Sequence, residues 1–445
     1  MKTLMITAMH SGAGKTVTTC ALLAALKQRG ERLQAFKCGP DYIDPMFHER
    51  VLQVPSRNLD LFLQGEAGVW KTLSRTQADL ALIEGAMGYY DGLNNTTDAS
   101  AYALARLTKT PVVLTLTPGG SGLTLAAQVK GLMDFRSDSG IAALILANCP
   151  ERRFASLAPV LERETGLPVL GYLPSMEEAR FESRHLGLLT AGEIRDLSAR
   201  MEKLSLAAEK SIDLDRLLML SGTWKGTSKQ PTAASSCCRI AVARDEAFCF
   251  TYADNLDALE EAGAELAFFS PLRDLELPKA DGLYLPGGYP ELYAEALSEN
   301  RAMMDSIAAA VKAGLPTVAE CGGFLCLGQS LEDEAGCAHP MCGVLPGEGF
   351  KTGRLQRFGY QTITAPADSL LFRAGEKIPA HEFHYWDATE NGADLIAEKA
   401  DGRSWPCGYA TPSLYAAFPH LHFGGTVPLA ERFVKACEEW KASMT

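Results

Sequence analysis

The stretch SGAGKT near the start of the chain combines the residue types that hold phosphate groups in proteins. It follows an apolar run typical of a β-strand and leads into a run typical of a helix. In such a loop, Gly12 and Gly14 let the backbone turn tightly and point N–H groups inward. Lys15 can reach β- and γ-phosphates, and the Thr16 hydroxyl is available to Mg²⁺. Met9 stands where the usual pattern has its first glycine, so the sequence predicts a variant phosphate-binding loop.

Acidic residues follow predicted strands in the same part of the chain. They are Glu84 and Asp91 in IEGAMGYYDG, and Asp41 and Asp44 in KCGPDYIDPMFH, beside Lys37 and His48. A buried carboxylate is costly unless it meets a metal or a hydrogen-bond donor, and the carboxyl ends of parallel strands share one edge of a sheet. This edge therefore favours a site for Mg²⁺ beside a nucleotide. Helix capping remains the alternative for Glu84, and turn formation the alternative for the aspartates at 41 and 44.

A second candidate site centres on Cys321 in TVAECGGF, between an apolar strand and a Gly-Gly helix start. Such an elbow exposes the thiol and aims helix N–H groups at it, which predicts a lowered pKa and a nucleophile. The preceding run LYLPGG ends a strand with Gly287 and Gly288. Their N–H groups, with that of Gly322, could surround a developing oxyanion.

Histidines near the end of the chain could supply the base that a cysteine nucleophile needs. His420 and His422 both stand in FPHLHF, and only one of them is expected to face Cys321. His381 and His384 form a second histidine pair in HEFHY, and are expected to serve either a substrate or a core.

Apolar runs alternate with helical stretches along the chain, which predicts an α/β fold with a parallel, doubly wound sheet. The first domain is predicted over residues 1–220, with a mainly helical closing segment at 176–220. Residues 221–237 are rich in Ser, Thr and Gly without an apolar period, and are predicted to form a linker. A second strand-helix alternation then predicts a different α/β domain over residues 238–445.

Composition narrows the class of protein. The chain has 445 residues, of which 47% are hydrophobic and 22% charged, values typical of globular enzymes. A formal net charge of −12 argues against binding to nucleic acid or to an anionic membrane, since both require a basic face. Twelve cysteines occur without CxxC pairs, and the apolar start is too short for a signal peptide or a membrane span. Reduced thiols and a cytoplasmic location are therefore expected.

Taken together, the motifs resemble the cobyrinate a,c-diamide synthase family. SGAGKT, KCGPDYIDPMFH, IEGAMGYYDG, ARDEAFCF, LYLPGGYPELYAEAL, AECGGFLCLG, RLQRFGY, HEFHY and HLHF occur in order across nearly the whole chain. The resemblance implies a dethiobiotin-synthetase-like P-loop domain joined to a class I glutamine amidotransferase domain. It also implies a ligase in which glutamine supplies ammonia, and ATP with Mg²⁺ converts the a- and c-acetate carboxylates of a cobyrinate-like tetrapyrrole to acyl phosphates. Ammonia then displaces phosphate to form the amides.

The resemblance also assigns roles to residues. It places the nucleotide on Gly12, Gly14, Lys15, Thr16, Asp41 and Asp91, Mg²⁺ on Thr16, Asp44 and Glu84, glutamine hydrolysis on Cys321 and His420, and the oxyanion on Gly288 and Gly322. Many class I amidotransferases carry Glu two residues after the catalytic histidine; His422 stands there, so the resemblance implies a Cys-His dyad. His422 itself stays open as the base.

Several alternatives share these features. Hydrogenobyrinate and nickel-sirohydrochlorin are related rings whose a- and c-acetates could be amidated in the same way. A different class of function is that of a P-loop ATPase switch whose second domain is an inactive amidotransferase-like module. An inactive module would not need both the thiol elbow and its histidine. The sequence leaves open the true tetrapyrrole, the order of amidation, the ammonia path and whether the chain forms a homodimer.

Overall fold

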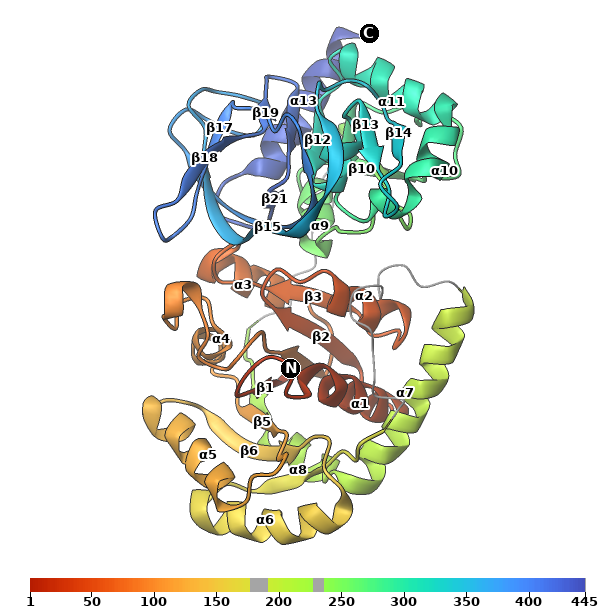
Figure 1. Cartoon of the computed structure of the whole chain (residues 1–445). Coiled ribbons are helices and arrows are strands. Elements are labelled where there is room, and N and C mark those ends of the chain that lie inside the picture. Colours follow the sequence, from red (N-terminus) through yellow and green to blue (C-terminus); the bar gives the residue numbers. More distant parts are fainter. Residues whose placement is uncertain (177–190, 227–235, 445) are drawn as a thin grey trace. The chain divides into compact units, whose positions relative to one another are not determined.

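The computed structural model describes residues 1–176, 191–226 and 236–444. It divides into two compact units, one made of Met1–Leu61 and Val69–Lys229, the other of Phe62–Gly68 and Gln230–Thr445 (Figure 1). Of the segment predicted as a linker, Gly222–Thr223 form a short strand, whereas residues 227–235 lie outside the described residues. No helix in the described residues is long and apolar enough to cross a membrane.

The first unit is built on one eight-stranded sheet with the order β3-β2-β4-β1-β5-β6-β7, to which β8 is added beside β1. Its strands are β1 (Lys2–Ala8), β2 (Leu33–Cys38), β3 (Ser56–Leu59), β4 (Leu80–Glu84), β5 (Val112–Leu116), β6 (Ile141–Leu146), β7 (Val169–Tyr172) and β8 (Gly222–Thr223). All pairs are parallel except β8 with β1. The predicted parallel, doubly wound sheet is confirmed.

Helices cover both faces of this sheet because successive side chains of a strand point to opposite faces. In β1, Leu4 and Ile6 belong to one core, and Met5 belongs to the other. The first core packs against α1 (Lys15–Gln28), α2 (Ile43–Arg50), α7 (Ala191–Ser211) and α8 (Leu214–Leu220). The second packs against α3 (Gly65–Ser74), α4 (Ala101–Thr108), α5 (Leu123–Phe135) and α6 (Glu151–Thr165), and the 3₁₀ turn η1 spans Leu93–Asn95. The helical segment predicted at 176–220 is confirmed from residue 191 onward; 177–190 lie outside the described residues.

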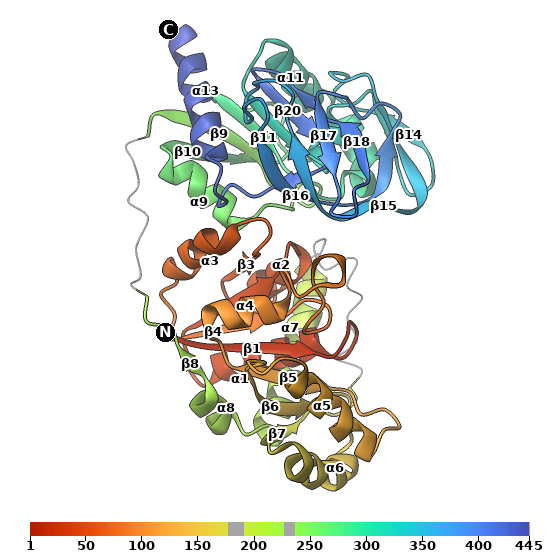
Figure 2. The same ribbon diagram turned by 90° about the vertical axis from the view of Figure 1, so that its left-hand side faces the viewer.

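The second unit contains a six-stranded sheet with the order β10-β9-β11-β12-β20-β19, parallel except for β19. Its strands are β9 (Cys238–Ala243), β10 (Ala264–Phe269), β11 (Gly282–Leu285), β12 (Thr317–Glu320), β19 (Tyr409–Ala410) and β20 (Leu414–Ala417). Its helices are α9 (Ala253–Glu261), η4 (Pro290–Tyr293), α10 (Ala294–Glu299), α11 (Arg301–Lys312), α12 (Gly322–Cys326) and α13 (Leu429–Ser443). Figure 2 shows α9 and α13 lying side by side.

A further seven-stranded, largely antiparallel sheet was not predicted from the sequence. It comprises β13 (Ser330–Glu332), β14 (Ala338–Pro340), β15 (Glu348–Thr364), β16 (Lys377–Ala388), β17 (Leu395–Glu398), β18 (Ser404–Cys407) and β21 (His420–Leu421). Buried and exposed residues alternate only irregularly along β15, so the strand has no clear period of two. In this sheet β21 pairs with β16 and sets His420 opposite His381.

Candidate functional site

The predicted phosphate loop joins β1 to α1 in a tight turn. Gly12 and Gly14 have φ angles of 76° and 86°, in the left-handed region that favours glycine. A Cβ on Gly14 would lie 2.8 Å from the Cβ of Ala147, so a side chain there would clash. The sequence forms this loop because its two glycines stand where the backbone needs them.

Lys15, the first residue of α1, folds back over the loop. Its ammonium donates hydrogen bonds to the carbonyl oxygens of His10, at 3.1 Å, and Met87. Burial lowers the pKa of Lys15 to about 8, with Lys37 adding to the effect. Opposing attraction from carboxylates that include Asp91 limits this shift. Below that pH the loop therefore carries a positive charge suited to a phosphate.

A buried charge cluster surrounds Glu84, the last residue of β4. Glu84 Oε1 accepts hydrogen bonds from Thr16 Oγ1 at 2.7 Å and from Lys37 Nζ at 2.9 Å. Lys37 also forms an ion pair with Asp44, and Glu84 Oε2 lies 3.7 Å from His48 Nε2. Burial and the nearby Asp44 raise the pKa of Glu84 to about 7. Asp44 in α2 and Glu84 at the end of β4 are therefore brought together through one lysine.

This cluster fits Mg²⁺ held together with a nucleotide better than a metal held by protein alone. The described residues contain no group of three His, Cys, Asp or Glu side chains that could hold a metal ion. Mg²⁺ commonly takes only one or two protein oxygens and completes its shell with water and phosphate. Thr16 and Glu84 offer such oxygens 2.7 Å apart. Asp44 is engaged by Lys37, so it is less suited to direct ligation.

Asp41 and Asp91 both shape loops at this edge. Asp41 Oδ1 accepts the N–H of Ile43 at 2.7 Å, at the start of α2, and burial with Asp44 raises the Asp41 pKa to about 6. Asp91 Oδ2 accepts the N–H of Gly88 at 2.9 Å. The contact between the Asp41 carboxylate and the Ile43 N–H is that of a turn-forming residue, which is the alternative role considered for Asp41.

The second site forms where β12 meets α12. Cys321 has φ 49° and ψ −102°, a conformation that L-residues rarely adopt and that often marks a functional position. Its N–H donates to the carbonyl of Ala417 at 2.8 Å. A Cβ on Gly323 would lie 2.1 Å from the carbonyl oxygen of Leu285, so the helix start packs directly on β11. This is the strand-turn-helix elbow that the sequence predicted.

The predicted lowering of the Cys321 pKa is wrong for this structure. The residue is only 5% exposed, whereas the sequence analysis expected the elbow to expose its thiol. Burial raises its pKa well above the ordinary value, and the carboxylates of Glu291 and Glu382 add to the rise. A hydrogen bond from the Gly322 N–H opposes the shift but does not outweigh it. The thiol is therefore protonated at neutral pH.

The structure brings His420 next to Cys321. A Cβ built on Gly287 would lie 2.4 Å from His420 Cε1 and 3.4 Å from Cys321 Cβ, so the bare glycine backbone separates the two side chains. A Cβ on Gly322 would lie 3.1 Å from the Gly288 nitrogen, so these two predicted oxyanion donors are also close. Burial lowers the pKa of His420 to about 3, which makes it a neutral base at physiological pH.

His422 packs against Tyr252 in the second unit. Its Nδ1 accepts the N–H of Gly424 at 3.1 Å, and its ring packs on Tyr252 with centroids 4.8 Å apart. On geometry, His420 is therefore the better candidate of the two for the base.

Glu320 was missed by the sequence analysis. This last residue of β12 is fully buried, and its Oε2 lies 3.9 Å from His420 Nδ1. Its carboxylate accepts hydrogen bonds from the Leu421 N–H and the Tyr284 hydroxyl, both at 2.9 Å. Burial raises its pKa to about 7. The available signal was the charged residue directly before Cys321 at the end of an apolar strand.

The HEFHY segment contributes a hydrogen-bonded network. Glu382 Oε1 lies 2.7 Å from His384 Nε2 and accepts a 2.7 Å hydrogen bond from Arg357. The His384 ring stacks on Phe418, with centroids 3.9 Å apart. His381 instead lies opposite His420 across the strand pair. His384 therefore packs in the core, which is one of the two roles predicted for these histidines. It also joins the charged network of Glu382 and Arg357.

Comparison with known proteins covers both units. Residues 4–188 match the CobQ/CobB/MinD/ParA nucleotide binding domain, and residues 239–427 match the CobB/CobQ-like glutamine amidotransferase domain. The cobyrinate a,c-diamide synthase of Clostridium acetobutylicum is 39% identical over 443 residues, which cover 98% of this chain and 100% of that protein. That of Listeria innocua is 40% identical over 437 residues, covering 95% and 96%. That of Synechococcus is 38% identical over 450 residues, covering 98% of each.

The burial of Cys321 makes a prediction about its reactivity. In the protein without glutamine, iodoacetamide at neutral pH should alkylate Cys321 at least about tenfold more slowly than the exposed Cys337, because burial both shields the Cys321 thiol from the reagent and raises its pKa. Peptide mass mapping over time measures both rates in one sample. Equal rates at the two cysteines would show that the thiol is activated before substrate binds.

Proposed function

Because the chain belongs to the cobyrinate a,c-diamide synthase family, we propose that it uses ATP and glutamine to amidate the a- and c-acetates of cobyrinate. One observation carries the proposal: a single chain holds both a phosphate loop with a strand-end acid and a cysteine elbow with a histidine beside it. The first arrangement suits activation of a carboxylate, and the second suits release of ammonia from an amide.

In the proposed synthetase half-reaction, a ring carboxylate oxygen attacks the γ-phosphorus of ATP, and ADP leaves. Ammonia then attacks the acyl phosphate carbon, inorganic phosphate leaves with the C–O bond electrons, and one ammonia proton passes to that phosphate to leave the neutral amide. Lys15 and the N–H groups of the glycine loop bind the phosphates. Thr16 and Glu84 would hold Mg²⁺, which when bound neutralises phosphate charge. Lys37 fixes the Glu84 carboxylate in place through its 2.9 Å hydrogen bond.

In the proposed glutaminase half-reaction, Cys321 Sγ attacks the side-chain amide carbon of glutamine while His420 takes the thiol proton. The N–H groups of Gly288 and Gly322 donate to the oxyanion that forms. His420 returns the proton to the leaving nitrogen, so ammonia departs and a thioester remains. Water, deprotonated by the same histidine, hydrolyses the thioester to glutamate and regenerates the thiol.

The cysteines support a proposed site of action in the cytoplasm. All twelve are free thiols in the structure, and nine of them are buried. Free thiols persist in reducing compartments, where disulfides are rare.

Variants of the synthetase site should lose amidation from either nitrogen source. We expect Lys15→Ala and Glu84→Gln to lower ATP-dependent diamide formation by roughly a hundredfold or more with ammonium as with glutamine, because both act on phosphoryl transfer. Diamide is measured by mass spectrometry. Lys130→Ala, an exposed lysine on α5, is the matched control and should retain full activity. Full amidation by Glu84→Gln with added ammonium would remove Glu84 from the reaction.

Variants of the cysteine site should respond to ammonium. We expect Cys321→Ser and His420→Ala to lose glutamine-dependent diamide formation by about three orders of magnitude, because a hydroxyl is a far weaker nucleophile and the thiol needs a base. High ammonium at mildly alkaline pH should restore the diamide in both. His422→Ala serves as the control and should use glutamine normally. Loss of both activities in a folded Cys321→Ser protein would contradict the division into two sites.

We propose Glu320 as the positioning residue for His420, in the place of the Glu that other amidotransferases carry after the histidine. Its carboxylate is ionised above its pKa of about 7 and protonated below, so wild-type glutaminase activity should fall as pH drops through that value. Glu320→Gln should lower the plateau roughly a hundredfold and remove this acidic limb. A plateau loss that leaves the acidic limb in place would assign Glu320 a purely structural role.

A further inference from the structure

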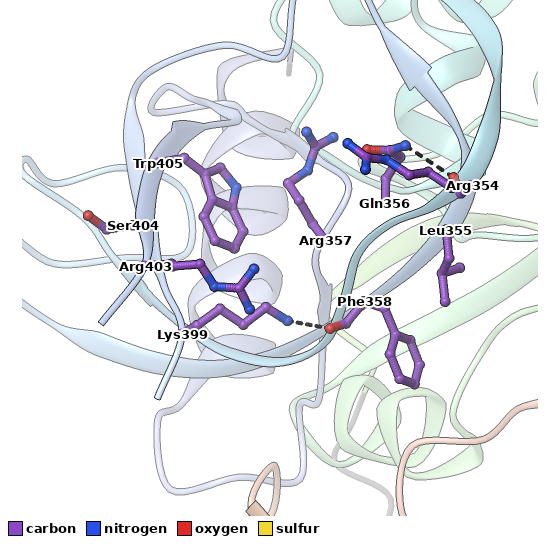
Figure 3. A pocket seen from close by; sticks show the side chains of 9 residues that line it. All are labelled: Arg354, Leu355, Gln356, Arg357, Phe358, Lys399, Arg403, Ser404 and Trp405. Carbon is purple, nitrogen blue, oxygen red and sulfur yellow. Dashed lines mark hydrogen bonds between the residues drawn. The ribbon is translucent and has the colours of Figure 1, made fainter. Parts of the chain in front are cut away.

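A cavity lined by basic side chains opens on the second unit, beside the irregular middle of β15. Its volume is about 690 Å³, and its lining residues are Arg354, Leu355, Gln356, Arg357, Phe358, Lys399, Arg403, Ser404 and Trp405 (Figure 3). Four of these nine are cations and none is acidic. In a chain with a formal net charge of −12, such a cluster points to an anionic ligand.

The cations are only partly satisfied by the protein itself. Lys399 donates to the carbonyl of Phe358 at 2.6 Å, which uses one of its three N–H groups. Arg403 donates to Asp401 Oδ2 from Nε at 2.8 Å and from Nη2 at 2.7 Å, but the two side chains are 73% and 46% exposed, so solvent screens this pair. Arg354 is exposed at the rim. Burial, with a contribution from Arg403, lowers the pKa of Lys399, so an arriving anion would relieve repulsion between two cations.

The backbone is distorted where it presents these side chains. The pairing of β15 with β16 shifts register between Lys351 and Gln356, and again between Gln356 and Gly359. Arg357 lies inside this stretch with φ 37°, a left-handed conformation that is costly for an arginine. Its guanidinium is anchored by Glu382 and Asp387, at 2.7 and 2.6 Å. Bulges of this kind re-aim side chains and concentrate beside functional sites.

Aromatic surface accompanies the charge. Trp405 lines the cavity, and Figure 3 shows the Arg403 side chain between its ring and Lys399. Phe358 is 54% exposed and packs edge-on against Phe383, itself 43% exposed, with centroids 5.3 Å apart. Exposed aromatic rings beside a cationic cluster suit a ligand that has a broad apolar ring and carboxylates at its rim.

We propose that this cavity binds the peripheral carboxylates of the tetrapyrrole substrate and so docks the ring on the amidotransferase unit; the identity of the ring rests on the proposed function. Glutamine is the competing carboxylate ligand, but its single carboxylate needs neither four cations nor a cavity of about 690 Å³. ATP is assigned to the phosphate loop of the other unit. The motif RLQRFGY, which supplies five of the nine lining residues, thereby acquires a role that neither half-reaction gave it.

The test uses charge reversal at the two exposed cations. Arg354→Glu and Arg403→Glu should each raise the KM for cobyrinate about tenfold or more in ammonium-dependent amidation, with kcat nearly unchanged, because each replaces attraction by repulsion. The rise should shrink as salt is added. Arg163→Glu, an exposed arginine of α6 that pairs with its neighbour Glu164, is the matched control and should change neither constant. Arg357 is left intact because it anchors Glu382.

Two further measurements separate the possible failures. The KM for glutamine in the glutaminase reaction should be unchanged in both variants; a rise there with an unchanged KM for cobyrinate would assign the cavity to glutamine and overturn the proposal. Equilibrium dialysis of cobyrinate against the full chain measures ring binding without catalysis. Binding that weakens in both variants supports the cavity even if no diamide forms, in which case only the proposed function fails. Binding equal to wild type in both variants overturns the cavity as the docking site.

Discussion

Each unit buries a glutamate at the carboxyl end of a parallel strand, and the cost of burying that carboxylate organises the residues around it. Glu84 ends β4 and Glu320 ends β12; both are fully buried, and burial raises the pKa of each to about 7. A buried charge without partners would cost several kcal/mol, so hydrogen-bond donors must converge on it. In the first unit those donors are Thr16 and Lys37, and in the second they include Tyr284.

The donors that satisfy the two carboxylates are themselves parts of the candidate sites. Thr16 lies in the first turn of the helix behind the phosphate loop, so its bond to Glu84 ties the loop to the end of β4. Leu421 follows His420 directly, so its N–H bond to Glu320 fixes the short strand that carries the histidine. The need to satisfy a buried carboxylate with hydrogen bonds therefore helps to position both candidate sites, the phosphate loop and the cysteine elbow with its histidine.

Local patterns in the sequence predicted the parts of each site that lie within one short stretch of the chain. Glycine spacing gave the loop before Lys15, and a strand followed by two glycines gave the elbow at Cys321. The sequence did not predict the contact between Glu320 and His420, because those residues are a hundred positions apart and meet through the pairing of β12 with β20, which sets Glu320 opposite Ala417. It also gave the wrong direction for the Cys321 pKa, since burial depends on packing that no local motif records.

Burial has a consistent effect on the two partners of the cysteine site. It raises the pKa of Cys321 and lowers that of His420, so both shifts favour a neutral thiol beside a neutral imidazole over a thiolate-imidazolium pair. An ion pair in such a setting must repay the desolvation of two charges, and it does so only when further hydrogen bonds stabilise it. In the proposed glutaminase reaction, glutamine bound with its amide carbon at Cys321 would supply that condition, because negative charge would then move from sulfur to an oxygen held by the N–H groups of Gly288 and Gly322. Under this proposal the proton transfer is coupled to attack on the substrate, and the thiol stays unreactive until an amide is in place.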